Sequence, residues 1–150
     1  MQVLSYPMSF SKSDSAGYLA NHMARLFASG LQKRILPLGL APAQFMVLLE
    51  LWALDGQTQS ALTQKLDVEQ ATMANTLRRM ERDGLIARHP SKEDKRARLV
   101  CVTDKARGLQ DQATKAAKEQ NRAALAGLSE AEQMVLIDMM QRVIAAMQRG

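Results

Sequence analysis

One face of the segment 70–82 carries polar and basic side chains whose types and spacing suit contact with DNA. At about 100° per residue, Met73, Leu77 and Met80 fall on one side of a helix, which predicts its buried face. Short amides and hydroxyls near the start of such a helix can bond base edges in the major groove, and arginines further along can pair with phosphates. By itself, the segment is also consistent with a solvated amphipathic helix that has no ligand. The polar set is Gln70, Thr72, Asn75, Thr76, Arg78, Arg79 and Arg82.

The segment 91–98 is the most basic stretch of the chain, and it lies between two short apolar runs that predict strands. An arginine at the tip of such a hairpin can enter the narrow minor groove, where the negative potential of DNA is deepest. Asp94 precedes Arg96 by two residues, so in an extended chain it would lie on the same side and orient the guanidinium. A surface hairpin without a ligand is the alternative interpretation. The cationic side chains of the segment are Lys92, Lys95, Arg96 and Arg98.

The positive charge of the chain is concentrated around these two segments. The formal net charge is +5 over 150 residues, and residues 78–107 alone hold ten basic and five acidic side chains. The rest of the chain is therefore electrically balanced. A local basic patch on a neutral body is the electrostatic footprint expected of a protein that binds the phosphate backbone. An ordinary solvated face would give the same composition, so charge alone does not decide between the two.

Helical periodicity and capping residues predict the elements that would hold these segments. Helices are expected over residues 14–36, 42–56, 59–66 and 69–83, followed by strands over 85–89 and 98–102. Gly84 suits a left-handed end for the fourth helix, and Thr103 can cap a fifth helix that runs to about residue 127. Ser129 and Glu132 have the spacing of a capping box for a sixth helix. Three helices followed by a hairpin are the layout of a winged helix-turn-helix.

The predicted fold class is mainly α: a winged helix-turn-helix with a helical dimerisation lobe built from N- and C-terminal helices. The expected division is a tail and dimerisation helix over 1–38, the winged helix-turn-helix over 39–104, and C-terminal dimerisation helices over 105–150. The first and last helices are too long and too apolar for a winged domain of about 65 residues to cover. We expect them to pack together and against a second copy of the chain.

Composition and motifs argue against membrane, secreted and enzymatic functions. The longest apolar stretch, 45–54, is far shorter than the roughly 20 residues that a bilayer needs. The first ten residues lack a secretory signal pattern and the single cysteine fits a reducing compartment, so a cytoplasmic location is expected. No phosphate loop, paired cysteines or zinc-protease spacing occurs, and His22 and His89 lie in different predicted elements. No catalytic residue, metal or cofactor is therefore expected.

The central segment resembles the multiple-antibiotic-resistance regulator (MarR) family of winged helix-turn-helix transcription regulators. The resemblance rests on VEQATMANTL over 68–77, RRMERDGLIAR over 78–88, the wing motif DKR over 94–96 and the strand 99–103. LAPAQF over 40–45 and TQSAL over 58–62 extend it, so the motifs cover about residues 40–107. The resemblance implies an obligate homodimer whose wings straddle a pseudo-palindromic operator. It also implies, commonly, a small anionic or phenolic effector bound between the lobes.

Residue roles follow from the same resemblance. Arg96 would contact the minor groove with Asp94 as its orienting partner, and the major-groove contacts would be Thr72, Asn75 and Thr76. For the effector, the expected location points to His22 and Arg25 of the first helix and Trp52 of the second.

Three departures from the family pattern bear on these expectations. Ala41 stands where a helix-capping Thr is common, and losing that bond would cost about 1 kcal/mol unless another group substitutes. Asp67 stands where Gly is usual before the fourth helix, and Asp tolerates left-handed geometry. No cysteine precedes Cys101, which is expected to pack as a small apolar residue rather than to act as a thiol switch.

The resulting hypothesis is a homodimeric, sequence-specific DNA-binding transcriptional regulator that acts as a ligand-responsive repressor. Its partners would be double-stranded DNA, a second copy of the chain and a small effector, with no membrane. The alternative is a helical protein-interaction module that uses a winged-helix fold and carries its basic patch incidentally. Salt dependence separates the two, because phosphate contacts weaken steeply as salt rises, whereas an apolar protein groove hardly responds.

Overall fold

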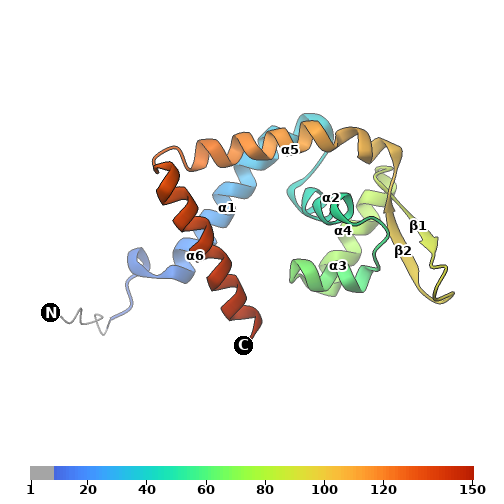
Figure 1. Ribbon diagram of the computed structural model, residues 1–150, viewed down its shortest axis with the longest axis horizontal. Coiled ribbons are helices and arrows are strands. Elements are labelled where there is room, and N and C mark those ends of the chain that lie inside the picture. The colour runs from blue at the N-terminus through green and yellow to red at the C-terminus, as the bar shows by residue number, and fades with distance from the viewer. Residues whose placement is uncertain (1–8) are drawn as a thin grey trace.

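A computed structural model describes residues 9–150; residues 1–8, the first part of the predicted tail and dimerisation segment 1–38, lie outside the described residues (Figure 1). The predicted mainly helical winged helix-turn-helix is confirmed, and each predicted helix and strand is present within about three residues of its expected bounds. In chain order the elements are η1 (Lys12–Asp14), α1 (Ala16–Ile35), η2 (Leu36–Leu38), α2 (Pro42–Ala53), α3 (Gln59–Leu66), α4 (Gln70–Arg82), β1 (Ile86–Pro90), β2 (Arg98–Val102), α5 (Asp104–Ala124) and α6 (Glu130–Gln148).

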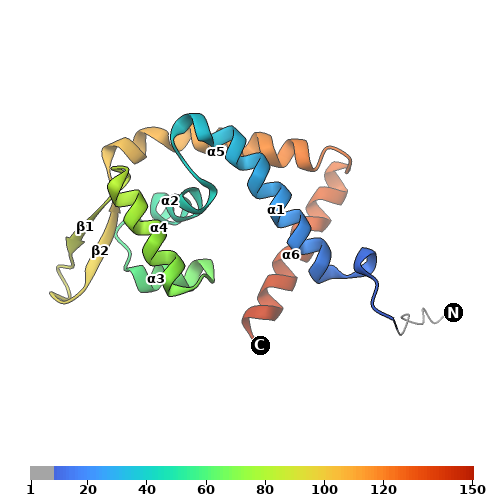
Figure 2. The ribbon, with the colours of Figure 1, turned by 180° about the vertical axis from the view of Figure 1, so that it is seen from behind.

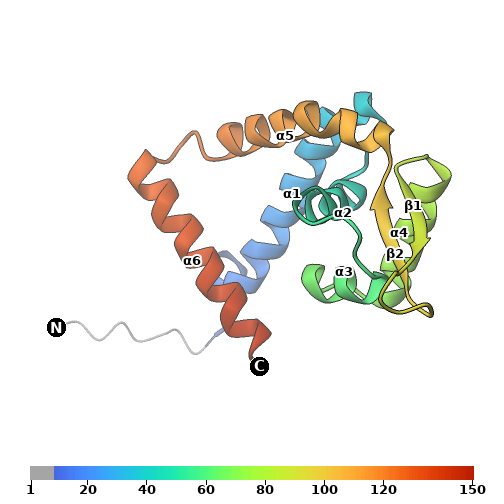
Figure 3. The ribbon, with the colours of Figure 1, turned by 45° about the vertical axis from the view of Figure 1, so that its right-hand side comes forward.

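The elements gather into two parts that α5 connects. Helices α2, α3 and α4 cluster with the β1–β2 hairpin, whereas α1, α5 and α6 enclose an open triangle (Figure 3). Helix α5 begins beside the hairpin, contacts α1 and ends at the loop that leads into α6 (Figures 1 and 2). A change in the angle between α5 and the clustered helices would therefore move the hairpin relative to the triangle.

Side-chain caps lie at the starts of α5 and α6, where the sequence predicted them. The Thr103 hydroxyl oxygen accepts the Ala106 N–H at 3.3 Å at the start of α5. At the start of α6, Ser129 Oγ accepts the Glu132 N–H at 3.1 Å, and the Glu132 carboxylate accepts the Ser129 N–H at 2.8 Å. This reciprocal pair confirms the predicted capping box.

Two positive-φ residues bracket α4. Asp67 ends α3 with φ 51° and ψ 43°, so the departure from Gly is accommodated by the left-handed geometry that Asp tolerates. Gly84 has φ 74° directly after α4 and turns the chain into β1, as predicted. Left-handed backbone geometry therefore marks the turn before α4 and the turn after it.

The hydrophobic core lies under α4 and the hairpin. It is built from fully buried side chains of α2, α3, α4 and β2, including Leu48, Leu62, Leu77 and Val100. The hairpin pairs in antiparallel register from Ile86 opposite Val102 to Pro90 opposite Arg98. Gln57 adds a single bridge on the other side of β2, with its N–H and C=O both bonded to Val100. The base of the hairpin is thereby held between the core and the chain that follows α2.

Helices α1 and α5 approach closely because both carry small residues where they meet. Ala113 and Ala116 of α5 are buried, whereas Ala124 and Leu128 at the far end are exposed. The Gln120 side chain occupies the space that a Cβ on Gly30 would need. Glycine at position 30 therefore permits a helix contact, which offsets its low helix propensity.

Apolar side chains remain exposed where α1 faces α6. Helices α1 and α6 together line a groove of about 470 Å³ whose lining is almost wholly apolar. The exposed residues of this groove include Leu19, Met23, Met139, Met140, Val143, Ile144 and Met147.

Among residues 9–150, no single helix is both long and apolar enough to cross a membrane; Ala16–Leu38 and Pro42–Ala53 meet that test only together, with a 75° bend between them.

Candidate nucleic-acid interface

Helix α4 is anchored by one face and presents the other. Met73, Leu77 and Met80 are at most 2% exposed, which confirms the buried face predicted from their spacing. The beginning of α4 and the tip of the β1–β2 hairpin lie toward the same edge of the winged domain (Figures 1 and 2). A single surface can therefore meet both elements at once.

The polar side chains of α4 differ in how free they are to bind a ligand. Gln70 begins the helix and Asn75 lies on its exposed side. The side-chain oxygen Oδ1 of Asn75 accepts a hydrogen bond from Arg78 Nη1 at 2.8 Å. The Thr76 hydroxyl donates to the Thr72 carbonyl at 2.9 Å. Thr72 and Thr76 also line a hollow of about 100 Å³ against α2. Gln70 and Asn75 are therefore the exposed amides among the predicted base-contact residues, and both threonines lie on the shoulder of the helix.

The wing loop between β1 and β2 is closed by its own hydrogen bonds. The Ser91 N–H donates to the Ala97 carbonyl at 2.9 Å, and the Ala97 N–H donates to the Asp94 carbonyl at 3.0 Å. Ser91 Oγ accepts the N–H groups of Glu93 and Asp94, both at 3.3 Å. The loop is a set of tight turns, and the exposed side chains around it include Lys92, Lys95, Arg96 and Arg98.

The geometry around Asp94 corrects one expectation. The Asp94 carboxylate accepts the backbone N–H of Arg96 at 3.0 Å and does not orient the Arg96 guanidinium. The reason is that residues 94–97 form a turn. The side chains of Asp94 and Arg96, two residues apart, therefore do not lie on the same side as they would in an extended chain. Asp94 shapes the backbone of the wing, and the Arg96 side chain remains free to reach outward.

Most of the cations of this surface have no carboxylate partner in the described part of the chain. Ion pairs engage Arg82 with Asp83 at 3.2 Å and Arg88 with Glu81 at 3.5 Å. Within residues 9–150, no carboxylate lies within 4.0 Å of the remaining six side chains, so their charge is not locally neutralised. These six are Arg78, Arg79, Lys92, Lys95, Arg96 and Arg98.

The structure shows supporting residues that the sequence analysis missed. Arg88 of β1 reaches both Glu81 of α4 and the Gln59 side chain at the start of α3, at 3.3 Å for the latter. Gln44 of α2 donates to the Asp83 carboxylate at 3.1 Å, and Lys105 of α5 donates to the Asp83 carbonyl at 2.8 Å. Most of these partners are far apart in sequence, so their pairing could not be predicted from local patterns. The only local signal for such a supporting residue was a charged or amide side chain next to a predicted helix end.

The environment of two titratable groups near α4 and β2 shifts their pKa values. The hydrogen bond from Gln44, then the hydrogen bond and charge of Arg82, lower the pKa of Asp83 below its usual range. Burial, and secondly the negative charge of Asp55, raise the pKa of the half-buried Cys101 thiol. Cys101 thus stays protonated at neutral pH, which agrees with its predicted role as a small packing residue.

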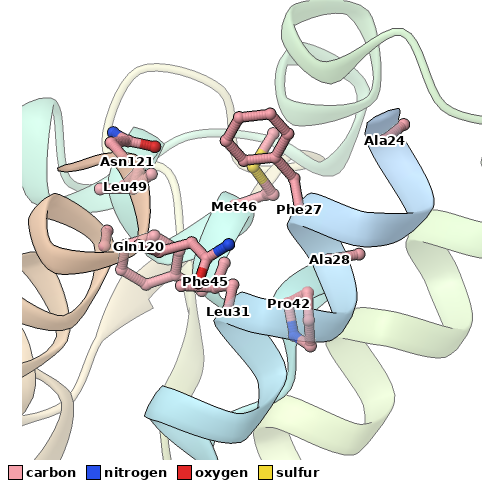
Figure 4. Close-up of a pocket in the computed structure, with 11 residues that line it drawn as sticks. Ala24, Phe27, Ala28, Leu31, Pro42, Phe45, Met46, Leu49, Gln120 and Asn121 are labelled. Carbon is pink, nitrogen blue, oxygen red and sulfur yellow. The ribbon is translucent and has the colours of Figure 1, made fainter. Parts of the chain in front are cut away.

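A cavity of about 430 Å³ lies where α1, α2 and α5 meet (Figure 4). Its walls are apolar except for the Gln120 and Asn121 amides of α5. The predicted effector residues are not among its lining residues: His22 and Arg25 are exposed on α1, and the Trp52 ring meets the Phe45 ring edge to face, with 6.2 Å between their centroids. The lining residues are Ala24, Phe27, Ala28, Leu31, Pro42, Phe45, Met46, Leu49, Ala117, Gln120 and Asn121.

No cluster of three His, Cys, Asp or Glu side chains that could hold a metal ion occurs among residues 9–150. The surface of α4 and the wing offers hydrogen-bonding groups and positive charge, presented by a helix and a hairpin at one edge. Such an arrangement is the winged helix-turn-helix class of module.

Comparison with known proteins shows what this module is similar to. Residues 40–97 match the model of the MarR family. Over 86 residues the chain is 36% identical to an uncharacterized HTH-type transcriptional regulator, YwoH, of Bacillus subtilis (strain 168). The match spans 57% of this chain and 62% of that relative. The proteins to which the chain is similar are thus named as transcriptional regulators and not as enzymes.

Two solved structures extend the likeness over most of the chain. A probable transcriptional regulator from Pseudomonas aeruginosa superposes with a TM-score of 0.83 at 28% identity, covering 89% of this chain and 99% of that one. A MarR-family regulator from Listeria monocytogenes, solved in complex with a 26mer DNA, superposes with a TM-score of 0.81 at 26% identity, covering 89% of each chain. The helices that flank residues 40–97 therefore also have counterparts in these structures.

Proposed function

We propose that this protein is a homodimeric, sequence-specific DNA-binding transcriptional regulator, acting in the cytoplasm as a ligand-responsive repressor. The observation that carries the proposal is the unneutralised charge on one edge: six cations on α4 and the wing have no carboxylate within 4.0 Å among the described residues. Helix α4 reads the major groove through Gln70, Thr72, Asn75 and Thr76, and the wing places Arg96 in the minor groove. The similar Listeria regulator bound to DNA supports this proposal.

The dimer follows from the apolar surfaces of the terminal helices. Helix α6 carries Met140, Val143 and Met147 on the face toward α1, and these side chains are 39%, 57% and 69% exposed in one copy of the chain. Leaving so much contiguous apolar surface in water is unfavourable, so a second copy covers it. We propose that the segments 1–38 and 105–150 build this lobe and that the segment 39–104 binds DNA.

An effector acts by fitting one arrangement of the dimer better than another. The cavity between α1, α2 and α5 touches both the dimer lobe and the first helix of the winged domain. A ligand held there changes the spacing of the two α4 helices only if it binds that arrangement more tightly. The Gln120 and Asn121 amides are its polar contacts, and a phenolic ring is of a size that suits the apolar walls.

Selection of bound fragments from a random duplex pool tests the proposal. The expected result is a two-fold symmetric motif whose half-sites lie about one helical turn, roughly 10 base pairs, apart. Affinity for the selected duplex should fall by about 10³–10⁵-fold between about 50 and 200 mM salt if the dimer neutralises about six to ten phosphates. No selected motif, together with salt-independent capture of a protein, would instead support the interaction module.

A further inference from the structure

The Gln44 side chain joins two helices that have different tasks. It is a buried polar group, only 6% exposed, in the first turn of α2. Its carbonyl oxygen accepts the Ala41 N–H at 3.1 Å, which is the half of a capping box that does not need a polar side chain at position 41. Its Nε2 donates to the Asp83 carboxylate at 3.1 Å, directly after the end of α4. Both ends of one amide are therefore used.

Asp83 receives bonds from other directions as well. Arg82 Nε donates to its second carboxylate oxygen at 3.2 Å, and Lys105 at the start of α5 donates to its backbone carbonyl at 2.8 Å. The end of α4 is thus bonded to α2 through Gln44 and to α5 through Lys105. The apolar contacts of α4 are non-directional, so these bonds, with the Glu81–Arg88 ion pair, constrain its rotation and tilt.

The same turn of α2 faces the cavity described above. Pro42, Phe45 and Met46 line it, and Gln44 lies between them in sequence with its side chain directed to Asp83. A shift of this turn by a molecule in the cavity would pull on the Gln44–Asp83 bond. One short turn of helix therefore connects the cavity wall to the end of α4.

We propose that Gln44 is a positioning residue for sequence-specific DNA binding: its bond to Asp83 sets the orientation of α4 relative to the cavity-lining turn of α2. This inference rests on the proposed function. Gln44 touches no DNA itself. Its loss should therefore reduce affinity for a cognate duplex, which requires α4 in register, more than affinity for an unrelated duplex, which requires only phosphate contacts.

A reversal of donor and acceptor tests the bond. Gln44→Glu places a carboxylate against Asp83, with Arg82 and Lys105 as the neighbouring cations. Asp83→Asn keeps an acceptor for Gln44. The double variant restores the pair with roles exchanged, because the amide introduced at position 83 can donate to the carboxylate introduced at position 44, which still accepts the Ala41 N–H. Gln112→Glu, on an exposed position of α5, is the control for the change in charge.

The measurements are affinity for the duplex selected by the parent chain, affinity for a shuffled duplex, and the melting temperature. We expect Gln44→Glu to weaken cognate binding by at least about tenfold and shuffled binding by less than about threefold, which matches typical coupling energies of residues in one hydrogen-bond network. Asp83→Asn, the double variant and Gln112→Glu should stay within about threefold of the parent. If Gln44→Glu melts below the assay temperature, Gln44→Met, of similar volume, is measured in its place.

Several results would overturn the inference. One is a lower melting temperature with cognate affinity unchanged, which would make the bond merely structural. Equal losses on cognate and shuffled duplexes, or no rescue in the double variant, would also reject it. A parent chain that selects no duplex would refute the proposed function and this inference together, whereas a parent that binds normally leaves the variants to judge the inference alone.

Discussion

Some side chains of the wing stabilise its backbone, whereas others are exposed and available to bind a ligand. Asp94 bonds its carboxylate to the Arg96 N–H at 3.0 Å, whereas the Arg96 guanidinium has no carboxylate within 4.0 Å in the described chain. The wing motif thus combines a turn-forming acid with a free guanidinium. This division makes the two residues separable by mutation.

Arg96→Ala should weaken binding to the selected duplex without changing dimerisation or melting temperature. The side chain is exposed, so its removal leaves no cavity, and it takes one phosphate or minor-groove contact from each protomer. The slope of log affinity against log salt should fall by about 1 for each phosphate that is no longer neutralised. Binding titrations at several salt concentrations measure this slope, and an unchanged slope and affinity would remove Arg96 from the interface.

Asn75→Ala should reduce discrimination between the selected duplex and single-base variants of it. A bidentate amide contact contributes about 1–3 kcal/mol of discrimination at one base pair. Because Asn75 also accepts a bond from Arg78, Arg78→Ala serves as the comparison. That variant should weaken all duplexes by a similar factor, and a uniform loss in Asn75→Ala as well would place Asn75 on the backbone instead.

At the scale of elements, the end of α4 is bonded to α2 and α5 through Asp83, and the contribution of Asp83 to stability depends on pH. Hydrogen bonds from Gln44 and Arg82 lower the pKa of Asp83, so its carboxylate is more stable charged in the folded chain than in the unfolded chain. The stability that this provides is present above the unfolded pKa and is lost as the pH falls through the folded pKa. The sign follows from the direction of the shift.

Asp83→Asn should therefore reduce the pH dependence of unfolding below about pH 4, the range in which an ordinary aspartate titrates. The variant should be less stable than the parent at neutral pH, and the difference should shrink as the pH falls. Denaturant melts between about pH 2 and 7 measure it. A difference that stays constant over this range would mean that Asp83 titrates alike in the folded and unfolded chains.

The elements themselves were largely predictable because their signals are local. Ser129 with Glu132, Thr103 and Gly84 each act within four residues, so reading them in order locates the helix ends. The Asp94 prediction was wrong because it assumed extended backbone where the chain turns. The Gln44–Asp83 bond joins residues 39 positions apart, and no pattern in the sequence indicates such a pair.

At the scale of the whole molecule, the terminal helices leave apolar side chains for a partner to cover. Helix α6 lines the groove with α1, yet Val143 in its C-terminal half is 57% exposed. The winged domain, by contrast, has its own buried core. We therefore expect dimerisation and folding of the winged domain to respond separately to mutation.

Val143→Glu should shift the protein from dimer to monomer and lower its affinity for a two-fold symmetric duplex at least about 100-fold. An unpaired charge is costly in an apolar interface, and a monomer cannot use the second half-site. Analytical ultracentrifugation and binding to full and half-site duplexes measure both effects. Gln112→Glu, which changes the charge equally on α5, should leave the parent assembly intact, and a dimeric Val143→Glu would place the interface elsewhere.

The amino-acid sequence alone determined the order of helices and strands, the basic face of α4, the charged wing and the apolar terminal helices, because periodicity, caps and charge act between near neighbours. Only the tertiary structure decided which residues surround the cavity, which acid shapes the wing turn and which amide connects α2 to α4. Those depend on where distant segments meet, and packing in three dimensions sets that meeting, since the same local pattern is compatible with many relative placements of the helices.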